Sequence, residues 1–302
     1  MLLLTIVFKG EKEELIYDIN EIEERLRNKD IHIGIYKEKE EEFNVLKIFS
    51  SDNSDLPKKT MDIIYYNLME IIYNHIILEF YYMEVDYILN EDYFFLGKEE
   101  IEEVKISLFN ILTNFQGIND EKSVYFSNRM NEIKEDILNV IKENNLINIH
   151  GYLRFRIREI KKKVCLIIDK IIESIMVEKE YDEFIKLLKY FVGMQDNKIN
   201  KLHIFIDNKG DYIIKDEKEN NIMNKFKKES FAEDIAEAVD MEDVIISGLV
   251  TSSPKKIIIH GANNCKNKEF INTIENVFES RVTLCDGCEQ CRKLLSKNVK
   301  NN

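Results

Sequence analysis

Only two prolines occur in this chain of 302 residues, and their positions constrain the fold strongly. Proline breaks helix interiors and is tolerated in the first turn of a helix or at the edge of an element. Pro57 and Pro254 therefore mark boundaries between structural elements. We expect an α+β fold that is predominantly α-helical. It is expected to have four parts, at residues 1–56, 57–200, 201–251 and 252–302.

The first part is predicted to be a small β-α-β-β unit. Residues 2–8 are apolar and indicate a strand, and residues 11–29 have the pattern of an amphipathic helix. Two segments in which apolar residues alternate, 31–36 and 43–49, are typical of strands. The loop before Pro57 ends this unit.

The second part is predicted to be a central helical bundle. Helices are expected at 58–90, 97–116, 122–145 and 151–195, the last with at least one break. Within 178–192, apolar residues recur every three or four positions and form one stripe. Such a stripe is typical of a helix that faces a core.

The last two parts return to β-structure, the third as a β-hairpin followed by helices. Segments 202–206 and 212–215 flank Asp207-Asn-Lys-Gly-Asp211, which predicts a β-hairpin because Asn and Gly tolerate a tight turn. The final part is predicted to be a strand at 255–260, a helix at 268–279 and a strand at 282–284. Two strands joined through a helix normally form a right-handed parallel crossover.

The sharpest chemical signal is a cluster of three cysteines within seven residues: Cys285, Cys288 and Cys291. Two-residue spacing lets successive thiolates converge on one metal ion, but a closed tetrahedral site needs a fourth ligand. In a parallel β-α-β unit, the loops after both strands emerge at the same edge of the sheet. We therefore expect Cys265, in the first of these loops, as the fourth ligand, with His260 as its substitute.

Zinc is favoured over an iron–sulfur cluster as the bound metal. A bacterial ferredoxin motif would continue to a fourth Cys followed by Pro, and Arg292-Lys293 stands after Cys291 instead. Four-ligand zinc sites commonly stabilise small modules. Two alternatives stay open: chemically idle reduced thiols, and a redox disulfide. The sequence has no Walker-type loop, GxGxxG, HExxH or nucleophile elbow, which favours a non-enzymatic protein.

A second candidate site consists of Arg154, Arg156 and Arg158. Guanidinium groups match phosphate and carboxylate geometry, so these residues could form an anion-binding face. Ion pairs with the many acidic helices are the competing interpretation. On a strand all three would share one face, whereas on a helix only Arg154 and Arg158 would align. The net charge of −13 argues against nucleic acid as a general partner.

The chain is expected to be cytoplasmic. Its apolar opening segment lacks the positive leader of an export signal. No segment reaches the roughly 18 uncharged apolar residues of a membrane span, because acidic residues interrupt the closest candidate, 61–89. In a reducing cytosol the cysteines would stay reduced or bind metal.

Two segments, Val177–Val192 and His150–Arg158, resemble the YtxC-like family. So does the order of hairpin, helix and the strand Pro254-Lys-Lys-Ile-Ile-Ile-His-Gly261. The resemblance covers at least residues 150–261 and implies a role in sporulation of Gram-positive bacteria. It implies no activity and no catalytic residue.

The sequence thus favours a non-enzymatic sporulation protein whose metal-stabilised C-terminal part contacts another protein. Two alternatives from other classes remain. One is a thiol or iron–sulfur redox protein that uses Cys285, Cys288 and Cys291. The other is a phosphate or nucleic-acid binder that uses the three arginines.

Overall fold

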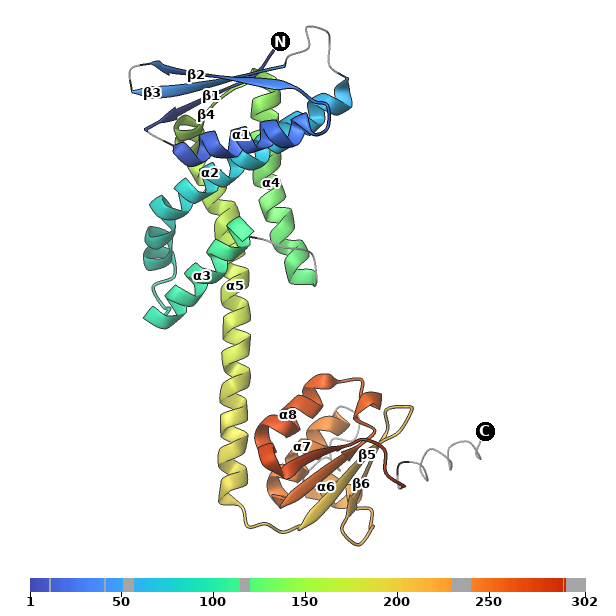
Figure 1. The fold of residues 1–302 in the computed structure, drawn as a ribbon. Coiled ribbons are helices and arrows are strands. Elements are labelled where there is room, and N and C mark those ends of the chain that lie inside the picture. The colour runs from blue at the N-terminus through green and yellow to red at the C-terminus, as the bar shows by residue number, and fades with distance from the viewer. Residues whose placement is uncertain are drawn as a thin grey trace. The chain divides into compact units, whose positions relative to one another are not determined.

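The computed structural model describes residues 1–10, 12–40, 42–50, 57–114, 120–229, 240–289 and 291. It confirms the expected fold class, since helices dominate and two small mixed sheets of four strands accompany them (Figure 1). The chain divides into two compact units, the N-terminal unit Met1–Met176 and the C-terminal unit Val177–Asn302. The four-part division expected from the sequence stays a prediction.

The N-terminal unit opens with the predicted β-α-β-β arrangement. Its elements are β1 (Leu2–Lys9), α1 (Glu13–Arg27), β2 (Ile33–Glu40) and β3 (Phe43–Ser50). Both β1 and β2 pair antiparallel with β3. A further strand, β4 (Leu146–Asn148), pairs parallel with β1 and was not expected, because three residues are too few for a recognisable alternation.

The helices agree with the prediction except in one respect. They are α2 (Lys58–Asp92), α3 (Lys98–Asn114), α4 (Glu121–Asn144) and α5 (Ile149–Met194). The break expected in the last helix is absent, and α5 is continuous through its 46 residues. It contains no proline, and its two glycines lie near its ends, so nothing interrupts the backbone hydrogen bonds. Among the described residues, no helix combines the length and the apolar character needed to cross a membrane.

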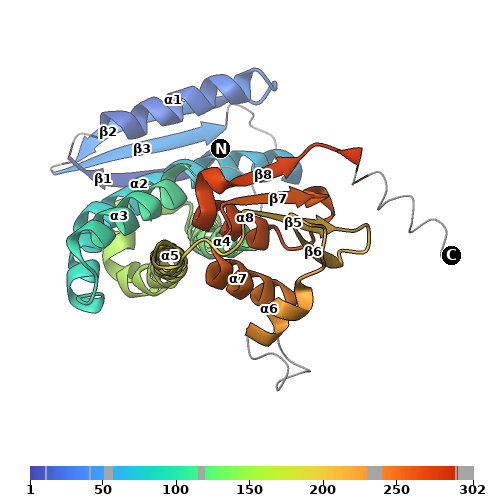
Figure 2. The ribbon, with the colours of Figure 1, turned by 90° about the horizontal axis from the view of Figure 1, so that it is seen from below.

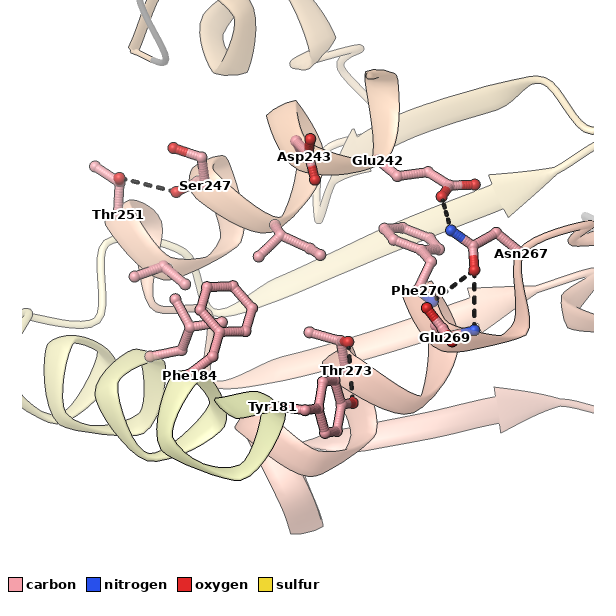
Figure 3. A pocket seen from close by; sticks show the side chains of 13 residues that line it. Tyr181, Phe184, Glu242, Asp243, Ser247, Thr251, Asn267, Glu269, Phe270 and Thr273 are labelled. Atoms are coloured by element: carbon pink, nitrogen blue, oxygen red, sulfur yellow. Dashed lines mark hydrogen bonds between the residues drawn. The ribbon is translucent and has the colours of Figure 1, made fainter. Parts of the chain in front are cut away.

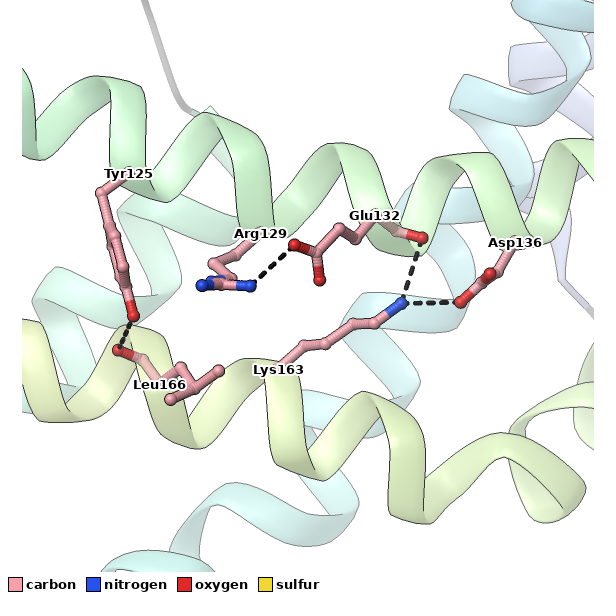
Figure 4. A network of polar contacts seen from close by, with 6 residues as sticks. All are labelled: Tyr125, Arg129, Glu132, Asp136, Lys163 and Leu166. Carbon is pink, nitrogen blue, oxygen red and sulfur yellow. Dashed lines mark hydrogen bonds and ion pairs between the residues drawn. The ribbon is translucent and has the colours of Figure 1, made fainter.

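Polar contacts fix α4 against α5 inside the N-terminal unit (Figure 4). The Nζ atom of Lys163 on α5 donates to the backbone oxygen of Glu132 at 3.1 Å and to Oδ2 of Asp136 at 2.6 Å. Arg129 donates to the Glu132 carboxylate at 2.7 Å. The two Lys163 bonds join α5 to α4 beside an apolar core of β1, α1, α2, α4 and α5 side chains, whereas the Arg129–Glu132 pair lies within α4.

The C-terminal unit contains the predicted hairpin and the predicted β-α-β module. The hairpin is β5 (Lys201–Ile206) with β6 (Tyr212–Asp216), and the module is β7 (Lys256–His260), α8 (Lys268–Phe278) and β8 (Val282–Cys285). β7 pairs parallel with both β5 and β8, which gives the order β6-β5-β7-β8 (Figure 2).

The two faces of this sheet have different environments. One face packs against the end of α5, α6 (Met223–Glu229), α7 (Met241–Ser252) and α8. The buried side chains on this face are Leu202, Ile204 and Ile206 of β5 and Ile257 and Ile259 of β7. Because successive side chains of a strand point to opposite faces, His203, Phe205 and His260 point to the other face.

Candidate metal centre

Four side chains converge at the carboxyl ends of β7 and β8: His260, Cys285, Cys288 and Cys291. Their ligand atoms all lie within 4.8 Å of one another. His260 and Cys285 are the last residues of their strands and are paired in register. The parallel crossover therefore brings together residues that are 25 positions apart in the sequence.

Interatomic distances describe the cluster closely. Nδ1 of His260 lies 3.3 Å from Sγ of Cys291 and 3.5 Å from Sγ of Cys288. Sγ of Cys291 lies 3.8 Å from Sγ of Cys285 and 3.6 Å from Sγ of Cys288. Cys291 thus contacts each of the other three ligand atoms.

These separations match the edges of a tetrahedral zinc site. Zinc binds sulfur at about 2.3 Å and imidazole nitrogen at about 2.0 Å, so tetrahedral geometry gives S–S edges of about 3.8 Å and N–S edges of about 3.6 Å. A disulfide would need sulfur atoms about 2 Å apart, and all of these cysteines are free thiols. The geometry therefore suits a single ion held by one nitrogen and three sulfurs.

Two glycines shape the backbone around the ligands. Gly261 follows His260 with φ of +71°, and a Cβ there would lie 2.4 Å from the carbonyl oxygen of Ile206. Gly287 has φ of +116° and lies between two ligand cysteines. L-residues with a side chain rarely adopt such conformations. Gly261 lets the chain leave β7 against β5, and Gly287 lets it turn between Cys285 and Cys288.

His203 on β5 adds a residue that sequence analysis missed. Its Nδ1 lies 2.9 Å from Nε2 of His260. When Nδ1 of His260 binds an ion, the ring proton is on Nε2, and this N–H group donates a hydrogen bond to Nδ1 of His203. Metal-binding histidines almost always donate their other N–H group, usually to a carboxylate, a backbone carbonyl or water. His203 would take that place here and fix the tautomer and the orientation of the His260 ring.

An aromatic side chain also packs against the face of the His260 ring. Phe205 stacks on it with centroids 4.2 Å apart and an angle of 11° between the planes. His203, Phe205 and His260 share one face of adjacent strands. Sequence spacing could not have revealed His203, because its contact depends on the pairing of β5 with β7.

The electrostatics of the site favour a neutral imidazole. Burial, with a further contribution from the charges of His203 and Lys201, lowers the pKa of His260 to about 4. Burial, together with hydrogen bonds to the thiols of Cys288 and Cys285, raises the pKa of Cys291 to about 11. At neutral pH the imidazole therefore offers a lone pair, whereas the thiol must release its proton to bind a cation.

Cys265 lies apart from the four ligands. After β7 the short 3₁₀ turn Ala262–Asn264 directs it into the apolar core on the helix-covered side. Its Sγ lies 3.3 Å from the hydroxyl of Tyr212 and donates to the carbonyl of Asn267 at 3.1 Å. The loop leaves the expected edge of the sheet, but the Cys265 thiol lies on the face opposite the three clustered cysteines. His260 is therefore the fourth potential ligand.

The three arginines lie on α5 in the N-terminal unit, and all three are exposed. On this helix Arg154 and Arg158 share a face and Arg156 diverges from it. None of the three forms an ion pair with a residue in the part of the chain that the structure describes. Anion binding by these residues stays a prediction.

We predict that His203→Ala weakens zinc binding by about 10- to 100-fold, the usual cost of losing an outer partner of a metal ligand. Competition against a chromophoric chelator would measure the loss. His203→Gln supplies an amide oxygen as acceptor and should restore most of the affinity. Equal affinities of the wild type and the alanine variant would contradict a positioning role for His203.

The fold and the cluster define an α+β protein with four potential metal ligands at one end of its C-terminal sheet. The model of the YtxC-like family matches residues 66–283, and the chain belongs to this family. The match includes His260, whereas the three cysteines follow it.

The chain is also similar to the "Uncharacterized protein YtxC" of Bacillus subtilis (strain 168). The two are 22% identical over 161 residues, which are 52% of this chain and 54% of that protein. The chain therefore spans about half the length of this curated relative. No solved structure matches the chain.

Proposed function

We propose that this protein is a non-enzymatic, zinc-binding cytoplasmic protein that acts in sporulation by contacting another protein. The observation that carries the proposal is the spacing of the four ligand atoms of His260, Cys285, Cys288 and Cys291. These atoms lie 3.3 to 3.8 Å apart along the four contacts given above. Such separations fit one tetrahedral ion.

The number of ligands supports a structural role for the ion. A catalytic zinc site keeps one position open for water or substrate, whereas structural sites are closed by four protein ligands. One imidazole and three thiolates would fill all four positions. The proposed ion therefore stabilises the fold and does not activate a substrate.

The position of the ligands indicates what the ion would stabilise. β8 is a short edge strand of four residues, and none of its side chains is fully buried. An ion shared by His260 and Cys285 would link β8 to β7. Cys288 and Cys291 would fasten the segment that follows β8 to the same point.

An iron–sulfur cluster fits this spacing less well. The four thiolates of a [4Fe–4S] cluster bind four different iron atoms, and those of a [2Fe–2S] cluster bind two iron atoms in pairs, so ligands on different irons must lie farther apart than ligands of one ion. The proposed sporulation role rests on membership of the YtxC-like family, and the cytoplasmic location on the reduced thiols that a metal site requires.

Metal analysis of protein purified without oxygen tests the proposal. We expect one equivalent of zinc per chain and no absorption near roughly 400 nm, where iron–sulfur clusters absorb. Brown protein containing iron would contradict the zinc proposal. Protein free of metal that also takes up no zinc on titration would contradict any metal function for this site.

A second candidate function is thiol redox chemistry, which the 3.6 Å distance between Sγ of Cys288 and Cys291 favours. Loss of two protons and two electrons to an oxidant such as a disulfide would join them, with the oxidant reduced to two thiols. Mass spectrometry after equilibration with glutathione redox buffers would detect this bond. Zinc-loaded protein that stays reduced would argue against the redox function.

A further inference from the structure

A groove opens between the end of α5, α7 and α8, entirely within the C-terminal unit (Figure 3). Its volume is about 620 Å³. It lies on the helix-covered side of the sheet, whereas the metal ligand His260 points to the other side. The groove is therefore a separate feature from the candidate metal centre.

The floor of the groove is apolar. It is formed by Phe184 and Leu188 of α5, Ile246 and Val250 of α7, and Phe270 of α8. In the first two pairs the residues are four positions apart, so each pair forms a ridge along its helix. Phe184 is 46% exposed, and its neighbour Leu187 is 51% exposed. Leu187 lies outside the groove, so Phe184 is the exposed apolar side chain among the residues that line it.

The rim of the groove is acidic. Glu242 and Asp243 come from the first turn of α7, and Glu269 comes from the first turn of α8. No basic residue occurs among the described residues that line the groove. The rim therefore presents negative charge at the end of the apolar floor where α7 and α8 begin, since Asn267 at the start of α8 contacts Glu242 at the start of α7 (Figure 3).

The exposed rim carboxylates are not needed to cap their helices. Asp240 accepts a hydrogen bond from the first turn of α7, and Asn267 does the same for α8. Neither Asp243 nor Glu269 forms an ion pair with any residue in the described ranges. Both are exposed, so their charges are available to a partner.

Glu242 differs from these two because it is held in place. The hydroxyl of Tyr212 and the side-chain amide of Asn267 both donate to its carboxylate. Tyr212 also contacts the thiol of Cys265. This network joins the buried thiol of Cys265 to Glu242 through Tyr212 and holds the Glu242 carboxylate in place at the groove.

We infer that this groove binds a basic amphipathic helix of a partner protein. Apolar side chains of the partner would pack between the two ridges, and its Lys and Arg residues would pair with Asp243, Glu269 and Glu242. Helix-in-groove recognition uses apolar anchors on one helix face in this way. The inference rests on the partner contact of the proposed function but not on bound zinc.

Fluorescence anisotropy of the full chain with a labelled peptide tests this inference. The probe is a synthetic helix with leucine on one face and lysine on the other, and its control has glutamate in place of lysine. We expect only the lysine peptide to bind. Asp243→Lys should weaken binding about tenfold, since like charges across an interface repel. Phe184→Ala should weaken it by removing an apolar contact.

Glu217→Lys is the matched control for Asp243→Lys. Glu217 is exposed and lies outside the groove, and the substitution changes the net charge equally. Equal binding of both peptides, or equal weakening by both charge variants, would overturn the inference. Self-association of the chain that Phe184→Ala abolishes, without peptide binding, would also overturn it by making a second copy the occupant.

The same titration with chelator present separates this inference from the zinc proposal. Charge-selective peptide binding by protein that takes up no zinc would support the groove and contradict only the metal site. Stoichiometric zinc without peptide binding would contradict only the groove. Thermal unfolding of each variant shows whether it is folded.

Discussion

Cys291→Ser should abolish stoichiometric zinc binding. Sγ of Cys291 lies within 3.8 Å of each of the other three ligand atoms, so it contacts the whole ligand set. Its loss leaves three ligands and an open position. Affinity should fall by more than the roughly 100-fold that loss of an outer partner costs. Metal analysis after gel filtration, and competition with a chelator, would measure the change.

Cys265→Ser is the matched control, because it also replaces one cysteine of the C-terminal unit. The Cys265 thiol contacts Tyr212 and Asn267, and Cys265 is not one of the four potential metal ligands. The variant should keep one equivalent of zinc, whereas His260→Ala should bind it weakly. Retention of zinc by His260→Ala and its loss from Cys265→Ser would show that four cysteines hold the ion.

Chelation of the ion should destabilise the C-terminal unit. When free zinc exceeds the dissociation constant 100-fold, binding adds about 2.7 kcal/mol to the free energy of unfolding. At roughly 2 to 4 °C per kcal/mol, its removal should lower Tm by about 5 to 11 °C. Thermal unfolding followed by calorimetry, with and without chelator, would measure this difference.

The effect of chelation should be confined to one part of the chain. All four ligands lie in the C-terminal unit, so hydrogen exchange should accelerate in β7, β8 and the segment through Cys291. Exchange in the core of the N-terminal unit should not change. Uniform acceleration in both units, or no change in β7 and β8, would contradict a local structural ion.

Much of the fold could be predicted from local patterns. An apolar run predicted β1, apolar alternation predicted β2 and β3, and the turn residues between β5 and β6 predicted the hairpin, while helical patterns predicted α2 to α5. These patterns succeed because each element buries one face in its own stretch of sequence. The failures are of two other kinds. β4 has three residues and depends on pairing with the distant β1, and α5 continues where an average helix would end.

The candidate site, like the fold, could be predicted only where local sequence determines it. The spacing of Cys285, Cys288 and Cys291 drew attention to them, and the crossover topology directed attention to the loop after β7. Topology does not determine on which face of a sheet a loop side chain lies. The turn after Gly261 directs Cys265 into the apolar core, whereas His260 keeps the strand's alternation and joins the thiols. His203 required the pairing of β5 with β7.

X-ray absorption at the zinc K edge of the zinc-loaded protein tests the four-ligand site directly. We expect three sulfur ligands at about 2.3 Å and one nitrogen ligand at about 2.0 Å. His260→Ala should lose the nitrogen contribution. A spectrum with four sulfur ligands would contradict the assignment of His260, and one with only oxygen and nitrogen ligands would contradict the site altogether.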